Sequence, residues 1–536
     1  MTDRWRRLER DRFDAVVVGA GVGGLTAGAL LARAGKRVLV VDGHTVAGGN
    51  TTVFRRRRWL FDVGLHYVGD CGPDGMVPRA LRLAGAAPVE WRELDPDGFD
   101  TLLFPGLTFR VPKGFEAYRE RLVEAFPAER AGVDRYVRLL RETWTLLEGT
   151  GGAFRWLLRL WRARLALRHA PRALGEFLDG CTRDPLLRAV IAGQSGTYAQ
   201  PPSRASLLMH AIVVGHYAQG AYYPQGGGQV VADRLADAIE RQGGALLLLT
   251  RATRIVVEGR RVTGVDLESH HLGRLRVRAP VVISNADLKR TLLDLVGPEH
   301  LRPGTVERTR GFEMSPSQGV VYLGLSRDLR AEGAPNTNLW VYPDADLEGQ
   351  YAAAREGRFH EAPFCYVSTA SLKDPHEPRL APPGHTNLQL MTVAPADPAA
   401  WGTTVEARRS GAYRDAPAYL EAKAAFAERL VAQAERALPG LGASVVFQEV
   451  STPLTHERYT RASGGTSYGI ALTPGQSLHR RPGAACEVKG LFLCGASLRN
   501  GHGIAGAMLS GVFAAGAALR RNLYRELMSG RNRWRP

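Results

Sequence analysis

The stretch Phe13-Asp-Ala-Val-Val-Val-Gly-Ala-Gly-Val-Gly-Gly24 decides the fold of this chain. Its apolar residues from Ala15 to Val18 predict a buried parallel strand, and the residues from Leu25 to Ala34 predict a helix. The glycines between them, Gly19, Gly21 and Gly24, have the G-x-G-x-x-G spacing. Such glycines permit a tight turn, bring a pyrophosphate close to the backbone and let the helix pack on the strand. The helix N-terminus then presents its unpaired N–H groups to the phosphates.

A second strand and an acidic residue complete this pattern. The residues from Arg37 to Val41 predict another apolar strand, which ends at Asp42, 18 residues after Gly24. That spacing is close to the one expected for a carboxylate that holds a ribose hydroxyl. Strand, glycine triplet, helix, strand and acid in this order predict a dinucleotide site. An ordinary βαβ unit with a glycine-rich turn is the alternative.

The composition is that of a globular protein with a strong positive charge. The chain has 536 residues, of which 45% are hydrophobic and 23% charged, and this length predicts two or three domains. The formal net charge of +17 favours nucleic acid or an anionic membrane as a partner, or reflects an arginine-rich proteome. Because aromatic residues are not interleaved with the basic runs, we expect no nucleic acid.

The sequence shows no metal motif and no targeting segment. None of the five cysteines forms a C-x-x-C pair, so we expect no metal site. The residues from Met1 to Arg12 lack the apolar core of a signal peptide, and no run reaches the ~18 apolar residues of a membrane-spanning helix. These observations predict a cytoplasmic protein, peripheral on the membrane.

One segment has the composition of a helix that lies in a membrane surface. From Phe154 to Leu165 the apolar residues recur at helical spacing. Arginines fill most of the other positions of this segment and its continuation: Arg155, Arg159, Arg162, Arg164, Arg168 and Arg172. Aromatic and leucine side chains would enter the acyl boundary, and the arginines would meet anionic lipid. A domain helix with a solvated basic face is the alternative.

The stretch from Trp59 to Val68 alternates as a strand does. Alternation would place Asp62, Gly64 and His66 together on one face, and Tyr67 on the other. A face with an acid, a glycine and an imidazole suits a backbone that lies against a cofactor, with His66 near the reacting atoms. A structural histidine held by hydrogen bonds is the alternative.

Near the C-terminus the chain repeats the combination of strand, glycine-rich loop and helix. The sequence reads Gly490-Leu-Phe-Leu-Cys-Gly-Ala-Ser497 and then Gly501-His-Gly-Ile-Ala-Gly-Ala-Met508, followed by an alanine-rich helix. The start of that helix is another N-terminus suited to anionic or polarised groups. A packing helix with small residues is the alternative.

These motifs together resemble the phytoene desaturase superfamily of flavoenzymes, which includes carotenoid desaturases, carotenoid isomerases and retinol saturases. Between the two glycine motifs stand a Tyr223-Pro-x-Gly-Gly227 loop and a Val282-Ile-Ser-Asn-Ala286 strand, in the order of that superfamily. Phe61-Asp-x-Gly-x-His-Tyr67 looks most like the retinol saturase branch, as does Gly464-Gly-Thr-Ser-Tyr-Gly469. Asn50 departs from the desaturases, which tend to carry arginine there.

The resemblance implies an α/β fold: a Rossmann-like FAD-binding domain of the glutathione-reductase and amine-oxidase type, with an inserted α+β substrate domain. The FAD-binding domain would be discontinuous and comprise residues 10–100, 220–300 and 445–525. Residues 101–219 and 301–444 would form the substrate domain, which faces the membrane, and residues 526–536 a basic tail.

The same resemblance assigns cofactor-binding residues. Gly19, Gly21 and Gly24 would hold the pyrophosphate of FAD, and Asp42 would hold its adenosine ribose. Thr253 would offer backbone to the adenine. The residues along the flavin would be Gly48, Gly49 and Gly64, and those that cap its ring and ribityl chain would be Gly495, Gly503, Ala505 and Gly506. A second nicotinamide motif is missing, so any NAD(P)H would bind transiently as a reductant.

The substrate implied is an apolar isoprenoid or polyene, of carotenoid or retinoid type. Such a molecule needs a large apolar tunnel, while the cofactor supplies the chemistry. In saturation, hydride would pass from flavin N5 to one alkene carbon, and His66 or Tyr67 would protonate the other. In desaturation the steps reverse. Carotenoid isomerisation, a flavin amine oxidase and a non-catalytic isoprenoid carrier are the alternatives.

Overall fold

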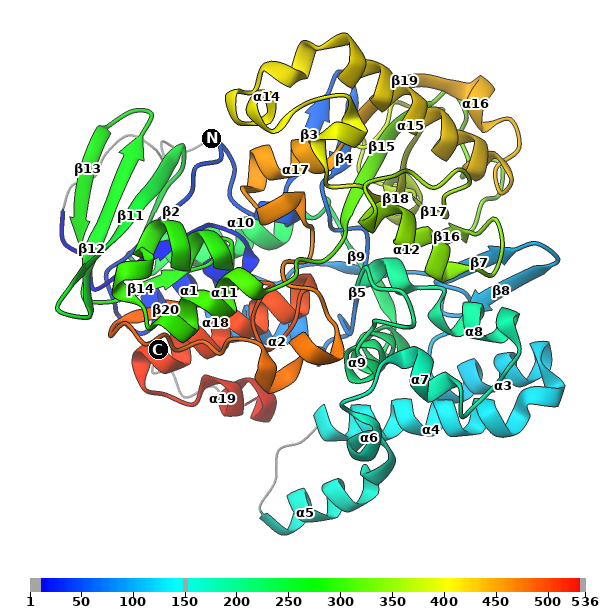
Figure 1. Ribbon diagram of the computed structural model, residues 1–536, viewed down its shortest axis with the longest axis horizontal. Helices are drawn as coiled ribbons and strands as arrows, with labels where there is room; N and C mark the ends of the chain where they lie inside the picture. Colours follow the sequence, from blue (N-terminus) through cyan, green and yellow to red (C-terminus); the bar gives the residue numbers. More distant parts are fainter. Residues whose placement is uncertain (1–10, 148–152, 531–536) are drawn as a thin grey trace.

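A five-stranded parallel sheet forms one half of the protein (Figure 1). The computed structural model describes residues 11–147 and 153–530. The strand order is β10 (Ala245–Leu247), β2 (Val38–Val41), β1 (Ala15–Val18), β14 (Val282–Ser284) and β20 (Leu491–Leu493). The helix α1 (Val22–Arg33) packs against α10 (Gln229–Arg241) and α18 (Gly503–Leu519). Strands from three distant parts of the sequence therefore meet in one sheet.

A smaller antiparallel sheet lies beside the first, at the left of Figure 1. It contains β11 (Thr250–Glu258), β12 (Arg261–Ser269) and β13 (Gly273–Arg278). Since β11 follows β10 directly, its first residues lie next to Asp42, and the backbone N–H of Thr250 donates to the carbonyl oxygen of Asp42.

The second half of the protein is built on a seven-stranded mixed sheet, at the upper right of Figure 1. Its order is β19 (Val445–Ser451), β15 (Ser317–Leu325), β18 (Thr386–Ala394), β17 (Cys365–Ser368), β16 (Asn338–Val341), β7 (Asp100–Phe104) and β8 (Leu107–Val111). The helix α15 (Pro417–Glu435) packs against this sheet. The strand β19 pairs with β15 and so belongs to this second sheet. The predicted FAD-binding domain includes residues 445–525 and therefore β19. The domain boundaries stay a prediction.

Helices form the lower right of the molecule in Figure 1. They are α3 (Phe115–Ala125), α4 (Arg130–Leu147), α5 (Ala153–Arg162), α6 (Arg164–His169), α7 (Leu174–Leu178), α8 (Pro185–Ala192) and α9 (Leu207–Ala218). No helix within the ranges 11–147 and 153–530 is long and apolar enough to cross a membrane. Residues 531–536 of the predicted basic tail lie outside the described residues.

The single strand predicted from Trp59 to Val68 is wrong. Strand β4 covers only Trp59–Asp62 and pairs with β3 (Val53–Arg56), and the chain resumes as β5 (Val68–Gly69), which pairs with β9 (Ala221–Pro224). The carboxylate of Asp62, the last residue of β4, accepts hydrogen bonds from the Tyr223 hydroxyl (2.6 Å) and the Gly228 N–H (2.9 Å). Gly64, His66 and Tyr67 lie in the irregular segment between β4 and β5 and not on two faces of a strand.

Candidate active site

A cavity of about 2060 Å³ lies between the two halves of the protein. It is lined by the turn between β1 and α1, the loop before α18, the helices α4 and α9, and strands of the second sheet. Ordinary ligand pockets measure about 300–1,000 Å³, so this cavity has room for more than one ligand. Most of the residues assigned from the sequence line it: Gly19, Gly21, Asp42, Gly48, Gly49, Gly64, His66, Tyr67, Thr253, Gly495, Gly503, Ala505 and Gly506.

The carboxylate of Asp42 is held in place at one end of the cavity. Its Oδ2 accepts from the N–H of Ala20 (2.7 Å) and its Oδ1 from the N–H of His44 (2.8 Å). A carboxylate has about four acceptor positions, so this one can still accept from a hydroxyl group in the cavity. Thr253 lies nearby on β11, and its hydroxyl donates to the Asp266 carbonyl oxygen (3.2 Å). This end fits the adenosine of a dinucleotide.

Two helix N-termini face the cavity. The helix α1 begins after Gly21 and α18 after His502, and no side chain in the described part of the chain caps either start. Gly19 has φ +99° and Gly495 has φ +106°, conformations that favour glycine. Gly24 lies behind the first turn, where a Cβ would collide with the carbonyl oxygen of Gly19. Its role is the packing of helix on strand.

Asn285, at the carboxyl end of β14, holds the two glycine loops together. A Cβ on Gly21 would lie 2.7 Å from Asn285 Nδ2, and one on Gly23 would lie 2.7 Å from Asn285 Oδ1. The thiol of Cys494 also donates to Oδ1 (3.4 Å). The sequence motifs predict no separate role for Asn285. Its position at the end of an apolar strand was the available signal, because ligands of open α/β sheets bind at the carboxyl ends of strands.

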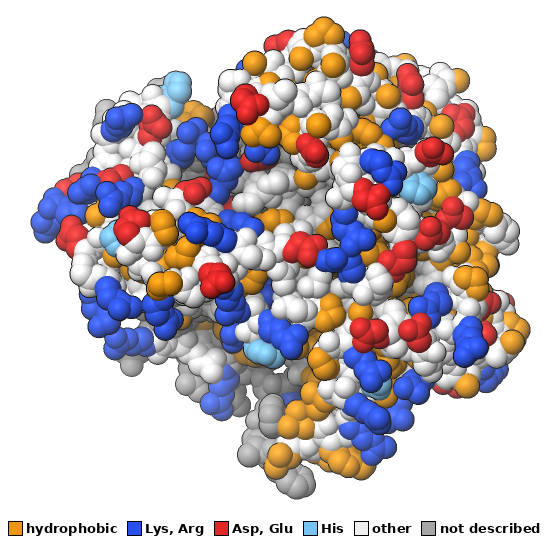
Figure 2. Space-filling view, in the orientation of Figure 1, with side chains coloured by type: hydrophobic (Ala, Val, Ile, Leu, Met, Phe, Trp, Pro, Cys, Tyr) orange, Lys and Arg blue, Asp and Glu red, His pale blue; other side chains and the backbone are white. Residues whose placement is uncertain are grey.

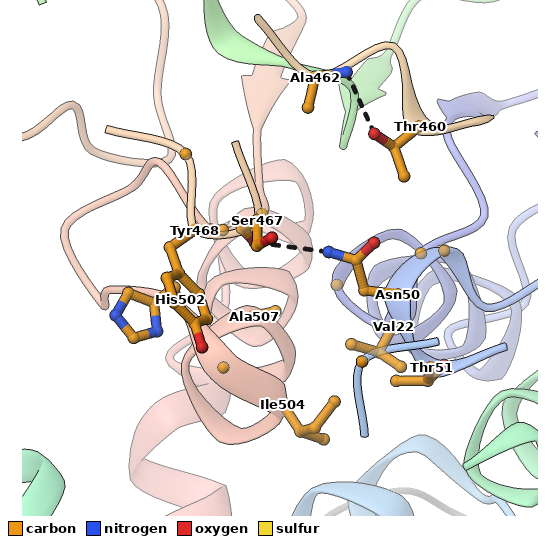
Figure 3. A pocket seen from close by; sticks show the side chains of 18 of the residues that line it. Val22, Asn50, Thr51, Thr460, Ala462, Ser467, Tyr468, His502, Ile504 and Ala507 are labelled. Atoms are coloured by element: carbon orange, nitrogen blue, oxygen red, sulfur yellow. Dashed lines mark hydrogen bonds between the residues drawn. The ribbon is translucent and has the colours of Figure 1, made fainter. Parts of the chain in front are cut away.

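The middle of the cavity has a floor of glycine backbone. Gly21 and Gly48 form a parallel bridge, and a Cβ on Gly49 would lie 3.2 Å from the Cα of Gly21. A Cβ on Gly64 would lie 3.1 Å from the Asn50 carbonyl oxygen. Asn50 Nδ2 donates to the Ser467 carbonyl oxygen (3.4 Å), across the cavity in Figure 3. A flat ring can approach this backbone closely, as the flavin requires.

His502 and Tyr468 stand beside this floor. Their rings overlap with centroids 4.3 Å apart, above the start of α18 (Figure 3). The His502 Nε2 is buried and has no hydrogen-bond partner among the residues that the structure describes. Burial lowers the pKa of His502 to about 3, so its ring is neutral. The helix starts, the anchored carboxylate, the glycine floor and this unpaired nitrogen fit an extended FAD.

His66 lines the cavity. Its Nδ1 is buried without a hydrogen-bond partner in the described ranges. Burial, with a smaller effect of the Lys373 ammonium, lowers the pKa of His66 to about 3. The backbone of His66 is fixed, because Lys373 Nζ donates to its carbonyl oxygen (2.8 Å) and to Ser368 Oγ (2.7 Å). The imidazole is therefore neutral near pH 7, and the backbone that carries it is held in place.

Tyr67 contributes a ring wall, and its hydroxyl points elsewhere. The hydroxyl donates to Asp100 Oδ2 (2.8 Å), which also accepts from Gln194 Nε2 (2.5 Å). Burial, and then the Asp100 carboxylate, raise the pKa of Tyr67 well above its ordinary value. The ring stacks on Tyr217 at 4.5 Å. Tyr67 is thus less suited than His66 to give a proton to a ligand in the cavity.

One arm of the cavity is apolar and aromatic. It is lined by Trp144, Leu147, Met209, Ile212, Val213, Tyr217, Trp340, Phe364, Tyr366 and Met391. Trp144 and Leu147 belong to the last turn of α4, so this arm reaches the helical part of the protein next to α5 and α6. Its chemistry suits a long hydrocarbon.

Exposed apolar and basic side chains gather on α5 and α6, at the lower end of the molecule in Figure 2. Leu157 is 61% exposed and Trp161 65% exposed, and the guanidinium group of Arg164 lies over the Trp161 ring at 5.4 Å. The side chains of residues 153–156, which the predicted helix includes, lie outside the described residues.

Comparisons with known proteins agree with this geometry. The family described as flavin containing amine oxidoreductase matches residues 22–519. An all-trans-retinol 13,14-reductase of Macaca fascicularis is 29% identical over 96% of this chain and 87% of its own length. A chloroplastic prolycopene isomerase of an Oncidium hybrid cultivar is 27% identical over 95% of this chain and 84% of its own length.

A solved structure shares the fold. An oxidoreductase from Methanosarcina mazei superposes with a TM-score of 0.63 at 16% identity, over 95% of this chain and all of its own. The predicted fold class and the resemblance to the retinol saturase branch are confirmed. The roles of the individual site residues stay predictions.

Proposed function

The chain belongs to the flavin containing amine oxidoreductase family, and from this premise we propose that it is an FAD-dependent oxidoreductase acting on carbon–carbon bonds of a retinoid- or carotenoid-like polyene. One observation carries the proposal: the aromatic arm and the floor of glycine backbone belong to the same cavity. The named activities of the two relatives support the substrate class, since both act on polyenes.

The residues of this chain would divide the work as follows. Asp42 accepts hydrogen bonds from the adenosine ribose, and the starts of α1 and α18 face the diphosphate and the ring. Bound FAD supplies hydride exchange at N5. The apolar arm orients the polyene and excludes water from the reacting carbons. Of the chain's own groups, His66 is our choice for the proton carrier, because the residue lines the cavity and its Nδ1 has no hydrogen-bond partner among the described residues.

The protonation state of His66 decides which proton it can donate. With its pKa lowered to about 3, His66 carries one N–H and no charge near pH 7. It would give this proton to the carbon on which negative charge develops as the neighbouring carbon receives hydride, and the imidazolate left behind would take a proton back from water when the product leaves. The donor to the cofactor would be NAD(P)H bound transiently. Desaturation or isomerisation in place of saturation is the alternative, and one of the two relatives is named as an isomerase.

We also propose that the protein is cytoplasmic and lies on an anionic membrane surface, through the face formed by α5 and α6. The apolar arm begins beside this face, so a polyene would pass from lipid into the cavity without crossing water. The exposed Leu157 and Trp161 and the neighbouring arginines support this placement.

The test is anaerobic turnover. The purified flavoprotein is reduced chemically, and retinoid and carotenoid polyenes are screened for re-oxidation of the flavin, with the product mass recorded. A product heavier than the polyene by two hydrogens supports saturation. An unchanged mass with altered geometry supports isomerisation. Re-oxidation by none of the polyenes would refute the proposed substrate class.

A further inference from the structure

The cavity has a second arm, and the proposed reaction with a polyene does not use it. This arm leads away from Asn50 along β3 and is closed by the turn at Ala412–Asp415, by α15 and by α17 (Pro453–Thr460). Its basic lining residues are Arg55, Arg56, Arg414, Lys423 and Arg458. Figure 2 shows the surface hollowed near the centre of the view, with Lys and Arg side chains around the hollow.

Most of these charges lack a counterion. Of the described residues, none gives a carboxylate to Arg55, Arg56, Arg414 or Arg458, whereas Lys423 lies 3.6 Å from Glu449. Among the described residues, the four guanidinium groups contact carbonyl oxygens or rings: Arg414 Nε donates to the Gly411 carbonyl oxygen (3.0 Å), and Arg458 lies over the Tyr459 ring (5.3 Å). Their remaining N–H groups are available to phosphate oxygens, which guanidinium groups bind well.

Aromatic rings line the same arm between its mouth and Asn50. Phe54 meets Tyr322 edge to face at 4.8 Å, and Tyr413 meets Tyr419 in the same way at 4.9 Å. All four rings line the cavity. Rings beside uncompensated guanidinium groups suit a ligand with flat bases and phosphates. They suit neither a plain hydrocarbon nor a lipid headgroup without a base.

The part of this arm formed by Arg55, Arg56 and Arg414 is separate from the residues that would bind FAD. Arg458 instead lies over the Tyr459 ring, which meets the His44 ring at 5.7 Å beside Asp42, so Arg458 also reaches the adenosine end. Arg251 and Arg461 also line the cavity, but Arg251 follows Thr250, whose N–H donates to the Asp42 carbonyl oxygen, so they lie at the adenosine end. The second arm instead meets the cavity at Asn50, next to the glycine floor on which the flavin ring would lie.

We propose that the second arm binds the hydride donor, a reduced nicotinamide dinucleotide with a 2′-phosphate, which enters by a different mouth from the polyene. The inference rests on the proposed function, since it supplies the reductant for the same flavin. In the step, the C4–H bond of the dihydronicotinamide breaks and its electron pair forms the N5–H bond. The nicotinamide is oxidised and the flavin reduced by two electrons. Because binding depends on surface guanidinium groups, it is weak and salt-sensitive.

The test measures binding without turnover. Adenosine 2′,5′-bisphosphate is titrated calorimetrically into the oxidised flavoprotein at low and high salt. We expect saturable binding that weakens with salt, and a loss on the order of tenfold for each of Arg55→Ala and Arg414→Ala. Arg409→Ala is the matched control, because Arg409 is exposed on α14 (Val405–Ser410) and does not line the cavity. The phosphate-bearing donor should also reduce the flavin faster than its 2′-hydroxyl form.

The outcomes separate the inference from the proposed function. Absent binding, or equal losses in Arg409→Ala, would overturn the second arm as the donor site. If polyenes still re-oxidise the chemically reduced flavin, the proposed function survives that result. If instead the bisphosphate binds as expected but no polyene reacts, the donor site stands and the proposed substrate class fails.

Discussion

Asn285 makes the first glycine motif intolerant of side chains. Gly21 has φ −67°, so its backbone accepts any residue, but a Cβ would lie 2.7 Å from Asn285 Nδ2. We expect Gly21→Val to displace Asn285 and close the space for the diphosphate, giving a folded protein without flavin. The measurement is the ratio of flavin to protein after purification. Gly304→Val is the control, since nothing lies within 4 Å of its Cβ. Wild-type flavin content in Gly21→Val would contradict the assignment.

His66 should matter for turnover more than for folding. We expect His66→Ala to slow single-turnover re-oxidation by the polyene by about two to four decades, the usual effect of a positioned proton carrier. Because burial lowers the pKa of His66 to about 3, its titration should leave no inflection near pH 6.5 in the rate profile.

The exposed His271 supplies the control for this variant, as His271→Ala. If His66→Ala keeps the re-oxidation rate but loses flavin, His66 belongs to cofactor packing and the catalytic assignment is withdrawn. Tyr67→Phe separates the remaining case, since Tyr67 directs its proton to Asp100 and should affect the rate less.

At the level of the helices, α5 and α6 should attach the protein to anionic membranes. Each arginine near an anionic surface contributes ~1 kcal/mol before screening, and this face has Arg159, Arg162, Arg164 and Arg168. We expect sedimentation with anionic vesicles that weakens in salt and falls sharply in Trp161→Ser. Leu420→Ser, at a 48% exposed position of α15, should change nothing. Equal binding to neutral vesicles would favour a solvated domain helix.

The helix α9 should make stability depend on pH through His210. Its ring is 2% exposed and lies between the hydroxyls of Tyr136 (2.8 Å) and Tyr198 (3.0 Å). Burial lowers the pKa of His210 to about 3, against about 6.5 in the unfolded chain. The unfolded state therefore binds the proton first as the pH falls. The contribution is complete above pH 6.5 and is lost between pH 6.5 and 3, about 2 kcal/mol of it by pH 5.

Denaturant unfolding of His210→Gln at pH 7 and pH 5 measures this effect. The amide keeps hydrogen-bonding groups but does not titrate, so the loss of stability between the two pH values should be smaller by about 2 kcal/mol than in the wild type. An unchanged difference would show that another group is responsible.

For the whole molecule, the sequence predicted what short-range patterns determine. The turn from Gly19 to Gly24, the carboxylate of Asp42 and the loop before α18 are each read from a few neighbouring residues, and all three line or shape the cavity.

The sequence failed where distant residues decide the structure. At the end of the strand from Trp59, the carboxylate of Asp62 binds Tyr223 and Gly228, more than 160 residues away. The hydrogen bond from Tyr67 to Asp100 also joins residues far apart in the sequence, as does the packing of Asn285 against Gly21. Alternation along one strand carries no information about such partners. His66 does line the cavity, but its neighbours could not be foreseen, and its place beside the cofactor stays a prediction.

Removal of FAD should destabilise the whole protein, because the cavity of about 2060 Å³ lies between its two halves. A ligand that binds only the folded state stabilises it by about 4 kcal/mol at 1,000 times its dissociation constant. We expect the melting temperature of the cofactor-free protein to rise with added FAD and to stay constant with added riboflavin, which lacks the diphosphate and adenosine. If added FAD left the melting temperature unchanged, binding of FAD in this cavity would be contradicted.

The same hollow centre ties the lifetime of the protein to vitamin supply. A cell short of riboflavin would accumulate protein without FAD between its two halves. Such protein would unfold more often and be degraded sooner by proteases. The amount of this enzyme would then follow the concentration of FAD in the cell, even while its gene is transcribed at a constant rate.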